Sequence, residues 1–162
     1  LLNYEGLKMP KHKDLKFTHT AKICDQFKIN DKEFVFIAAY FNAISFTEDF
    51  ESKAAEKGVN FDLETNGING FLDDDFIRES IIDCLAFYSR VRVYLPDEMI
   101  GDYHPIECAA HDFWYTRNGH GTGFWDKSDE YGDWQSKKFT NIAESFGESF
   151  PIYEYIFPSE TE

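Results

Sequence analysis

Apolar residues recur three and four positions apart in four separate stretches of the chain, which is the spacing of one face of an α-helix. The stretches lie near 31–45, 74–91, 104–119 and 134–146. Residues typical of helix boundaries stand at their ends: Asn30-Asp31, Asp73 to Asp75, Pro105, Gly119 and Gly147. The spacing therefore predicts about four principal helices, with a further short helix within 47–57.

Two segments have the pattern of β-strands instead. Residues 15–23 place Leu15, Phe17, His19, Ala21 and Ile23 at alternate positions. The segment 150–157 is aromatic and β-prone. The sequence thus predicts an α+β fold: a mainly helical single domain with a small β element that pairs residues near 15–23 and 150–157.

The chain has the length of one ordinary domain. Its 162 residues are enough to bury about 70% of the surface that the unfolded form exposes. Aromatic residues make up 18% of the sequence, so we expect an aromatic core. Residues 1–14 are polar and rich in lysine, and we expect a flexible basic arm there, followed by a single globular domain over 15–162.

Charge is divided unevenly along the chain. Residues 1–32 hold seven lysines and four acids, a net of +3, whereas residues 33–162 hold nine basic and 26 acidic residues, a net of −17. An acidic body repels nucleic acid and attracts basic surfaces. Direct DNA binding by the body is therefore disfavoured. No apolar stretch is long enough for a membrane span and no secretion signal is recognisable, so we expect no membrane contact and a cytoplasmic protein.

The cysteines give little sign of chemistry. Cys24, Cys84 and Cys108 lack the close pairing of zinc or redox motifs, so we expect buried free thiols and neither metal nor cofactor.

The three aspartates of 73–75 fit a helix start better than a cation site, because carboxylates there accept hydrogen bonds from free backbone N–H groups.

Most of the chemically versatile residues are concentrated in 111–126. On a helix, His111 and Tyr115 share one face. The turn that follows could hold an anion through Arg117, Asn118, Gly119, His120 and Gly121. Acid–base pairs of His111 with Asp112 or of His120 with Asp126 are conceivable, as is a metal site of His111, His120 and Asp126.

An architectural interpretation of the same segment is favoured. Arg117 and Asn118 would satisfy the last carbonyls of the helix, and Gly119 would end it. Arg117 would also pair with Asp112 or Asp126 and fix the turn. The rings of Trp114, Phe124 and Trp125 would fill the core beneath it.

The pattern Asp112-Phe113-Trp114-x-Thr116-Arg117-Asn118-Gly119-His120-Gly121-x-Gly123-Phe124-Trp125-Asp126 resembles a motif of small, acidic, uncharacterised proteins of tailed bacteriophages and prophages. A weaker resemblance extends over about 34–150. The resemblance implies a phage or prophage origin and an infected host cell as the setting. It implies no particular activity.

Two functions follow as hypotheses. The first is a non-enzymatic phage accessory protein that binds a basic surface of a host protein, with a DNA-mimic inhibitor of a nucleic-acid-handling or defence enzyme as its sharpest form. Its binding residues would be the acids and the tryptophan at Asp73, Asp74, Asp75, Asp129, Glu130, Asp133 and Trp125, beside the turn residues. The alternative is a small hydrolase or a nucleotide- or phosphate-binding domain that uses His111, Asp112, Arg117, His120 and Asp126.

Overall fold

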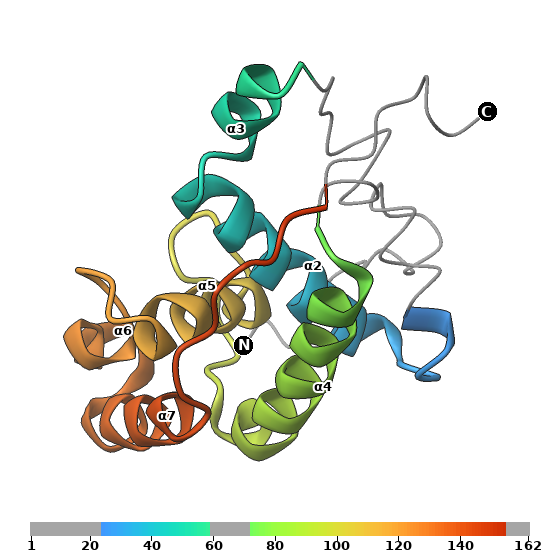
Figure 1. Cartoon of the computed structure of the whole chain (residues 1–162). Coiled ribbons are helices and arrows are strands. Elements are labelled where there is room, and N and C mark those ends of the chain that lie inside the picture. The colour runs from blue at the N-terminus through green and yellow to red at the C-terminus, as the bar shows by residue number, and fades with distance from the viewer. Residues whose placement is uncertain (1–23, 59–71, 155–162) are drawn as a thin grey trace.

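Helices account for nearly all the regular structure of the protein (Figure 1). The computed structural model describes residues 24–58 and 72–154. The helices are α2 (Asp31–Thr47), α3 (Phe50–Glu56), α4 (Asp74–Val91), α5 (Pro105–Arg117), α6 (Ser128–Tyr131) and α7 (Asp133–Ser145), with the 3-10 turns η3 (Arg92–Tyr94) and η4 (Phe124–Asp126). The four principal helices and the short one within 47–57 are confirmed.

The predicted β element is wrong, and with it the α+β class. No strand occurs within 24–58 or 72–154. Tyr153 forms only an isolated antiparallel bridge with Leu72, supported by a 2.8 Å hydrogen bond from the Asp73 N–H to the Ile152 carbonyl. Pro151 lacks an N–H and so cannot extend a ladder. Residues 15–23 and 155–157 lie outside the described residues, as does the expected arm 1–14. The fold is mainly α-helical.

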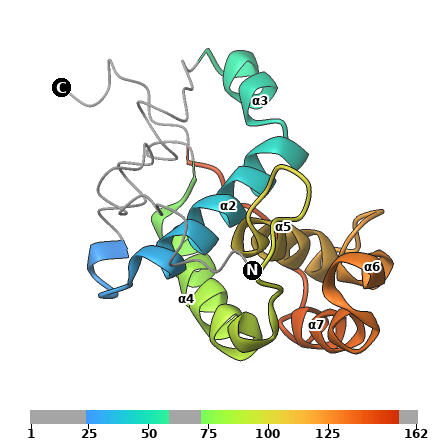
Figure 2. The same ribbon diagram turned by 180° about the vertical axis from the view of Figure 1, so that it is seen from behind.

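Helix α2 lies at the centre of the arrangement, with α4 and α5 packed against it (Figures 1 and 2). Asn30 caps the start of α2: its side chain accepts a 2.8 Å bond from the Glu33 N–H, and the Glu33 side chain accepts one from the Asn30 N–H. Its buried residues fall on every side of the helix: Phe34, Val35, Phe36, Ile37, Ala38, Ala39, Tyr40, Phe41, Ala43 and Ile44. A helix that is apolar around its circumference belongs in a core.

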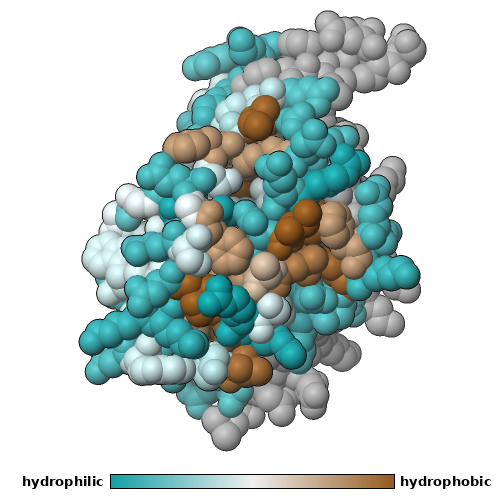
Figure 3. All heavy atoms as spheres, turned by 60° about the horizontal axis from the view of Figure 1, so that its bottom comes forward, coloured by the Kyte–Doolittle hydropathy of each residue, from teal (hydrophilic) through white to brown (hydrophobic). Residues whose placement is uncertain are grey.

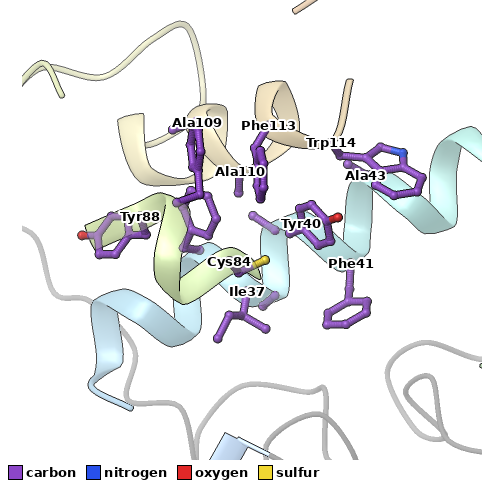
Figure 4. Packing of buried hydrophobic residues seen from close by; sticks show 14 of the residues in the cluster. Ile37, Tyr40, Phe41, Ala43, Cys84, Tyr88, Ala109, Ala110, Phe113 and Trp114 are labelled. Carbon is purple, nitrogen blue, oxygen red and sulfur yellow. The ribbon is translucent and has the colours of Figure 1, made fainter. Parts of the chain in front are cut away.

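Aromatic rings join the helices in the interior. Phe87 of α4 and Phe113 of α5 stack with centroids 4.1 Å apart, and Tyr40 of α2 meets Trp114 edge-on at 5.5 Å. Figure 4 shows Tyr40, Cys84 and Phe113 converging on one space from these three helices. Cys24, Cys84 and Cys108 are free thiols, the first two buried and the third half-buried.

The chain after α7 returns to the start of α4. The segment after α7 runs across the molecule to the start of α4, where Tyr153 meets Leu72 (Figure 1). On the face drawn in Figure 3, apolar residues form small clusters with hydrophilic residues between them. None of the described helices is both long and apolar enough to cross a membrane.

Candidate functional site

The segment 111–126 runs from the second half of α5 through a turn into η4. Its chemically active side chains do not all converge on one cleft. Asp112 and Arg117 are buried and bind different partners, Asp126 lies in the turn, and the two histidines contact aromatic rings. The arrangement expected for an acid–base or anion site is therefore not assembled by these residues.

Asp112 is a structural carboxylate. It is 1% exposed, accepts a 2.7 Å hydrogen bond from the Tyr131 hydroxyl and forms a salt bridge with Lys127. Burial raises the pKa of Asp112, and the contacts with Lys127 and Tyr131 offset part of that rise. The carboxylate ties α6 to α5. Tyr131 is itself buried, so its hydroxyl is committed to this contact.

Arg117 also faces inward. Its guanidinium forms a 3.0 Å ion pair with Asp83 of α4 and donates a 3.1 Å bond to the hydroxyl of Tyr40 of α2. It donates to the carbonyls of Gly147, at 2.9 Å, and Phe146, at 3.4 Å, at the end of α7. The predicted pairing with Asp112 or Asp126 is wrong. One cation instead holds four parts of the chain together.

The turn after α5 is closed by its own hydrogen bonds. The Asn118 amide donates to the Trp114 carbonyl at 3.0 Å, and Gly119 adopts a φ of +66°, as expected for a glycine that ends a helix. The Gly119 N–H donates to the Thr116 carbonyl and the His120 N–H to that of Tyr115. These two amides are thus engaged within the turn, while Gly121 is exposed.

The end of the motif is organised around Thr116 and Asp126. The Thr116 hydroxyl accepts a 3.0 Å bond from the Phe124 N–H, and Asp126 accepts one from the Gly123 N–H at 3.0 Å. Phe124 is buried as expected, whereas Trp125 is 55% exposed. Trp125 therefore does not fill the core.

Neither histidine is hydrogen-bonded to its proposed acid partner among the described contacts, although His111 and Asp112 both line a small cavity. The His111 ring meets Tyr103 edge-on at 5.5 Å, and the His120 ring meets Tyr115 edge-on at 5.8 Å. Burial, with a smaller contribution from Lys127, lowers the pKa of His111 to about 4. Within 24–58 and 72–154, no three His, Cys, Asp or Glu side chains are grouped to hold a metal ion.

The predicted acidic binding residues divide by role. The Asp73 side chain accepts a 3.0 Å bond from the Phe76 N–H and caps α4, while Asp74 and Asp75 are exposed in its first turn. Three more acids are exposed on or beside α6: Asp129, Glu130 and Asp133.

The structure also reveals a cavity that the sequence did not indicate. It has a volume of about 860 Å³ and lies between the C-terminal half of α2, α3 and α5. Tyr103, from the loop before α5, lines it together with His111 and Tyr115, the pair whose shared face the sequence did predict. The exposed Phe46 also lines this cavity, which we call the α2–α5 hollow.

No family model, curated protein or solved structure matches the chain.

Proposed function

We propose that the protein is a non-enzymatic accessory protein that binds a basic surface of another protein. The observation that carries this proposal is the charge of two neighbouring segments, 94–103 and 126–134, which we call the acidic segments. They hold seven exposed carboxylates: Asp97, Glu98, Asp102, Asp126, Asp129, Glu130 and Asp133. Their single basic residue, Lys127, is bound to the buried Asp112.

The two acidic segments lie close together at two points. The rings of Tyr94 and Trp134 meet edge-on at 5.2 Å. A second, smaller cavity of about 220 Å³ is lined by Ile100 and Tyr103 from one segment and by Glu130 and other residues from the other. Like charges gathered in this way give a field that speeds encounter with an opposite charge.

Exposed rings beside the carboxylates supply apolar contact area. Trp125 is 55% and Trp134 is 54% exposed, and both lie in or next to the second acidic segment. Tryptophan is among the residues that contribute most to binding energy when a partner covers it. The resemblance to phage proteins supports a host protein as the partner. A nucleic-acid-binding protein, which presents a basic surface, is the class we propose.

The test compares two variants that each lose four charges. The first, Asp97→Asn, Glu98→Gln, Asp129→Asn, Glu130→Gln, changes the acidic segments; the control, Asp75→Asn, Glu79→Gln, Glu144→Gln, Glu148→Gln, changes exposed acids elsewhere. The probe is a labelled peptide rich in arginine and lysine. We expect the first variant to associate about tenfold more slowly than the wild type at low salt and the control to change far less.

Equal losses in both variants would contradict the proposal, because net charge alone would then explain binding. A second measurement tests the class of partner. The protein should displace duplex DNA from basic DNA-binding proteins in competition assays, and the first variant should do so poorly. Failure of the wild type to compete with DNA on any of a panel of such proteins would remove the DNA-mimic form.

A further inference from the structure

The α2–α5 hollow lies next to the acidic segments and differs from them in chemistry. In Figure 2 the yellow segment that precedes α5 loops over α5 beside the C-terminal half of α2. Tyr103, at the end of this loop, lines both the hollow and the smaller cavity, and so do His111 and Tyr115. These three residues therefore separate a large recess from one that borders α6.

The wall of the hollow is aromatic. The Tyr103 ring is perpendicular to the His111 ring, and the His111 and Tyr115 ring centroids are 6.5 Å apart. Tyr103 is 53% exposed, and Phe46, which also lines the hollow, is 83% exposed. Tyrosine faces attract cations, most of all a planar guanidinium that can stack on them.

Carboxylates complete the lining. Asp49, Glu51 and Glu107 all border the hollow, and the described ion pairs include none of them. No lysine or arginine is among the residues that line the hollow, and the lysines Lys53 of α3 and Lys127 are engaged with Glu48, at 2.9 Å, and with Asp112. The hollow is thus negative, which favours a cation as its occupant.

His111 does not neutralise this charge. Its pKa of about 4 leaves the imidazole uncharged at neutral pH, since burial disfavours the cation and Lys127 adds to the effect. Anions are excluded as occupants by the three carboxylates. A guanidinium is planar and can stack on an exposed tyrosine face such as that of Tyr103, whereas an ammonium group is a compact point charge.

We propose that the α2–α5 hollow binds an arginine side chain of the basic partner, with its guanidinium against Tyr103 and Tyr115 and its N–H groups directed at Glu107, Asp49 and Glu51. This inference rests on the proposed function, because it names the group of the basic surface that the protein recognises. Carboxylates accept paired N–H bonds from guanidinium in a geometry that lysine cannot match.

The lining carboxylates can be neutralised without loss of their structural roles. Asp49 caps α3 with a φ of 49°, and asparagine both caps helices and tolerates that conformation. Glu107 accepts a 3.3 Å bond from the His104 N–H, a role that glutamine also fills. The test variant is therefore Asp49→Asn, Glu51→Gln, Glu107→Gln, and the matched control is Asp75→Asn, Glu79→Gln, Glu144→Gln.

The probes are two short capped peptides that differ only in an arginine or a citrulline, which has the same shape without the charge. NMR titration should move the ring resonances of Tyr103, His111 and Tyr115 with the arginine peptide. The citrulline peptide should bind about tenfold more weakly, as should the arginine peptide with the test variant, whereas the control should match the wild type within about twofold. Tyr103→Ala should weaken binding as well.

The outcomes separate this inference from the proposed function. Equal affinity for the two peptides, equal affinity of a lysine peptide, or shifts confined to the acidic segments would overturn the arginine site. If binding of the longer basic peptide still depends on the acidic segments, the proposed function survives that result. Loss of binding in the hollow variant but not in the acidic-segment variant would support the arginine site and contradict the role given to the acidic segments.

Discussion

Gly121 and Gly123 stand two residues apart in one turn, but only Gly121 has room for a side chain. A Cβ on Gly123 would collide with the Thr116 hydroxyl, which holds the Phe124 N–H, whereas one on Gly121 would meet nothing within 4 Å. We expect Gly123→Ala to lower the free energy of unfolding by about 1–3 kcal/mol, because neighbours must shift. Gly121→Ala should change it by less than about 0.5 kcal/mol. Urea denaturation measures both free energies of unfolding. Equal losses in the two variants would contradict the predicted collision with Thr116.

His111 links protonation to stability. Its pKa is about 4 in the folded protein, below the ordinary 6.5 of an exposed histidine. The unfolded chain therefore binds the proton first, so the stability from the neutral ring is complete above pH ~6.5 and is lost as the pH falls toward ~4. We expect His111→Gln to flatten this decline.

The raised pKa of Asp112 acts in the opposite direction, and the lowered pKa of His104 acts in the same direction as that of His111. Both groups remain in the variant, so the difference between the two proteins isolates His111. Denaturant midpoints at several pH values give the measurement. Parallel curves for wild type and His111→Gln would show that the ring does not titrate in this way.

At the scale of elements, Arg117 joins α5 to three other parts of the fold. Its removal would leave the Tyr40 hydroxyl and the carbonyls of Phe146 and Gly147 without this donor and would separate Asp83 from its cation. We expect Arg117→Ala to reduce the free energy of unfolding by about 3 kcal/mol or more.

The matched control is Arg90→Ala, which removes an exposed arginine from the last turn of α4 and should lie within about 0.5 kcal/mol of the wild type. Arg117→Lys keeps the charge but loses the planar array of guanidinium N–H donors. We therefore expect an intermediate loss in the free energy of unfolding. Chemical denaturation of the three variants tests the order. A loss for Arg117→Lys as small as that of Arg90→Ala would mean that charge alone matters.

The elements themselves were predictable where the signal is local. Helix spacing and capping residues such as Asn30 and Asp73 depend on neighbours in sequence, and the structure confirms them. The strand at 150–157 was wrong because aromatic content favours a strand only if a partner strand pairs with it, and Pro151 opposes pairing. The four-residue helix α6 was too short to leave a periodic signal.

The site was less predictable than the fold. The sequence identified His111 and Arg117 as candidate site residues. It could not place Asp83 beside Arg117, because that contact depends on how α4 packs on α5. The solvent exposure of single side chains could not be predicted either: Trp114 is buried and Trp125 is exposed, although both belong to the same motif. Tyr103 could be found only once its loop was seen over α5.

At the scale of the whole molecule, the formal net charge is −14, so the excess carboxylates repel one another. Salt screens exposed charges that lie farther apart than about 10 Å at 0.1 M. We expect the acidic-segment variant Asp97→Asn, Glu98→Gln, Asp129→Asn, Glu130→Gln to be more stable than the wild type at low ionic strength, by up to about 1 kcal/mol. Salt should erase the difference. Thermal unfolding at two ionic strengths measures it, and a variant less stable than the wild type would show that these carboxylates support the fold.

Residues 34–41 of α2 are buried on every side of the helix, whereas Asn42 and Phe46 farther along it are exposed. Its backbone amides should exchange with deuterium only when the whole domain opens, at the rate of global unfolding. Helix α3, with Phe50 and Ala54 as its buried residues, can open by itself and exchange sooner. We therefore expect α2 to be the last of the described helices to exchange, and a chain break within it to remove the surface on which α4 and α5 pack.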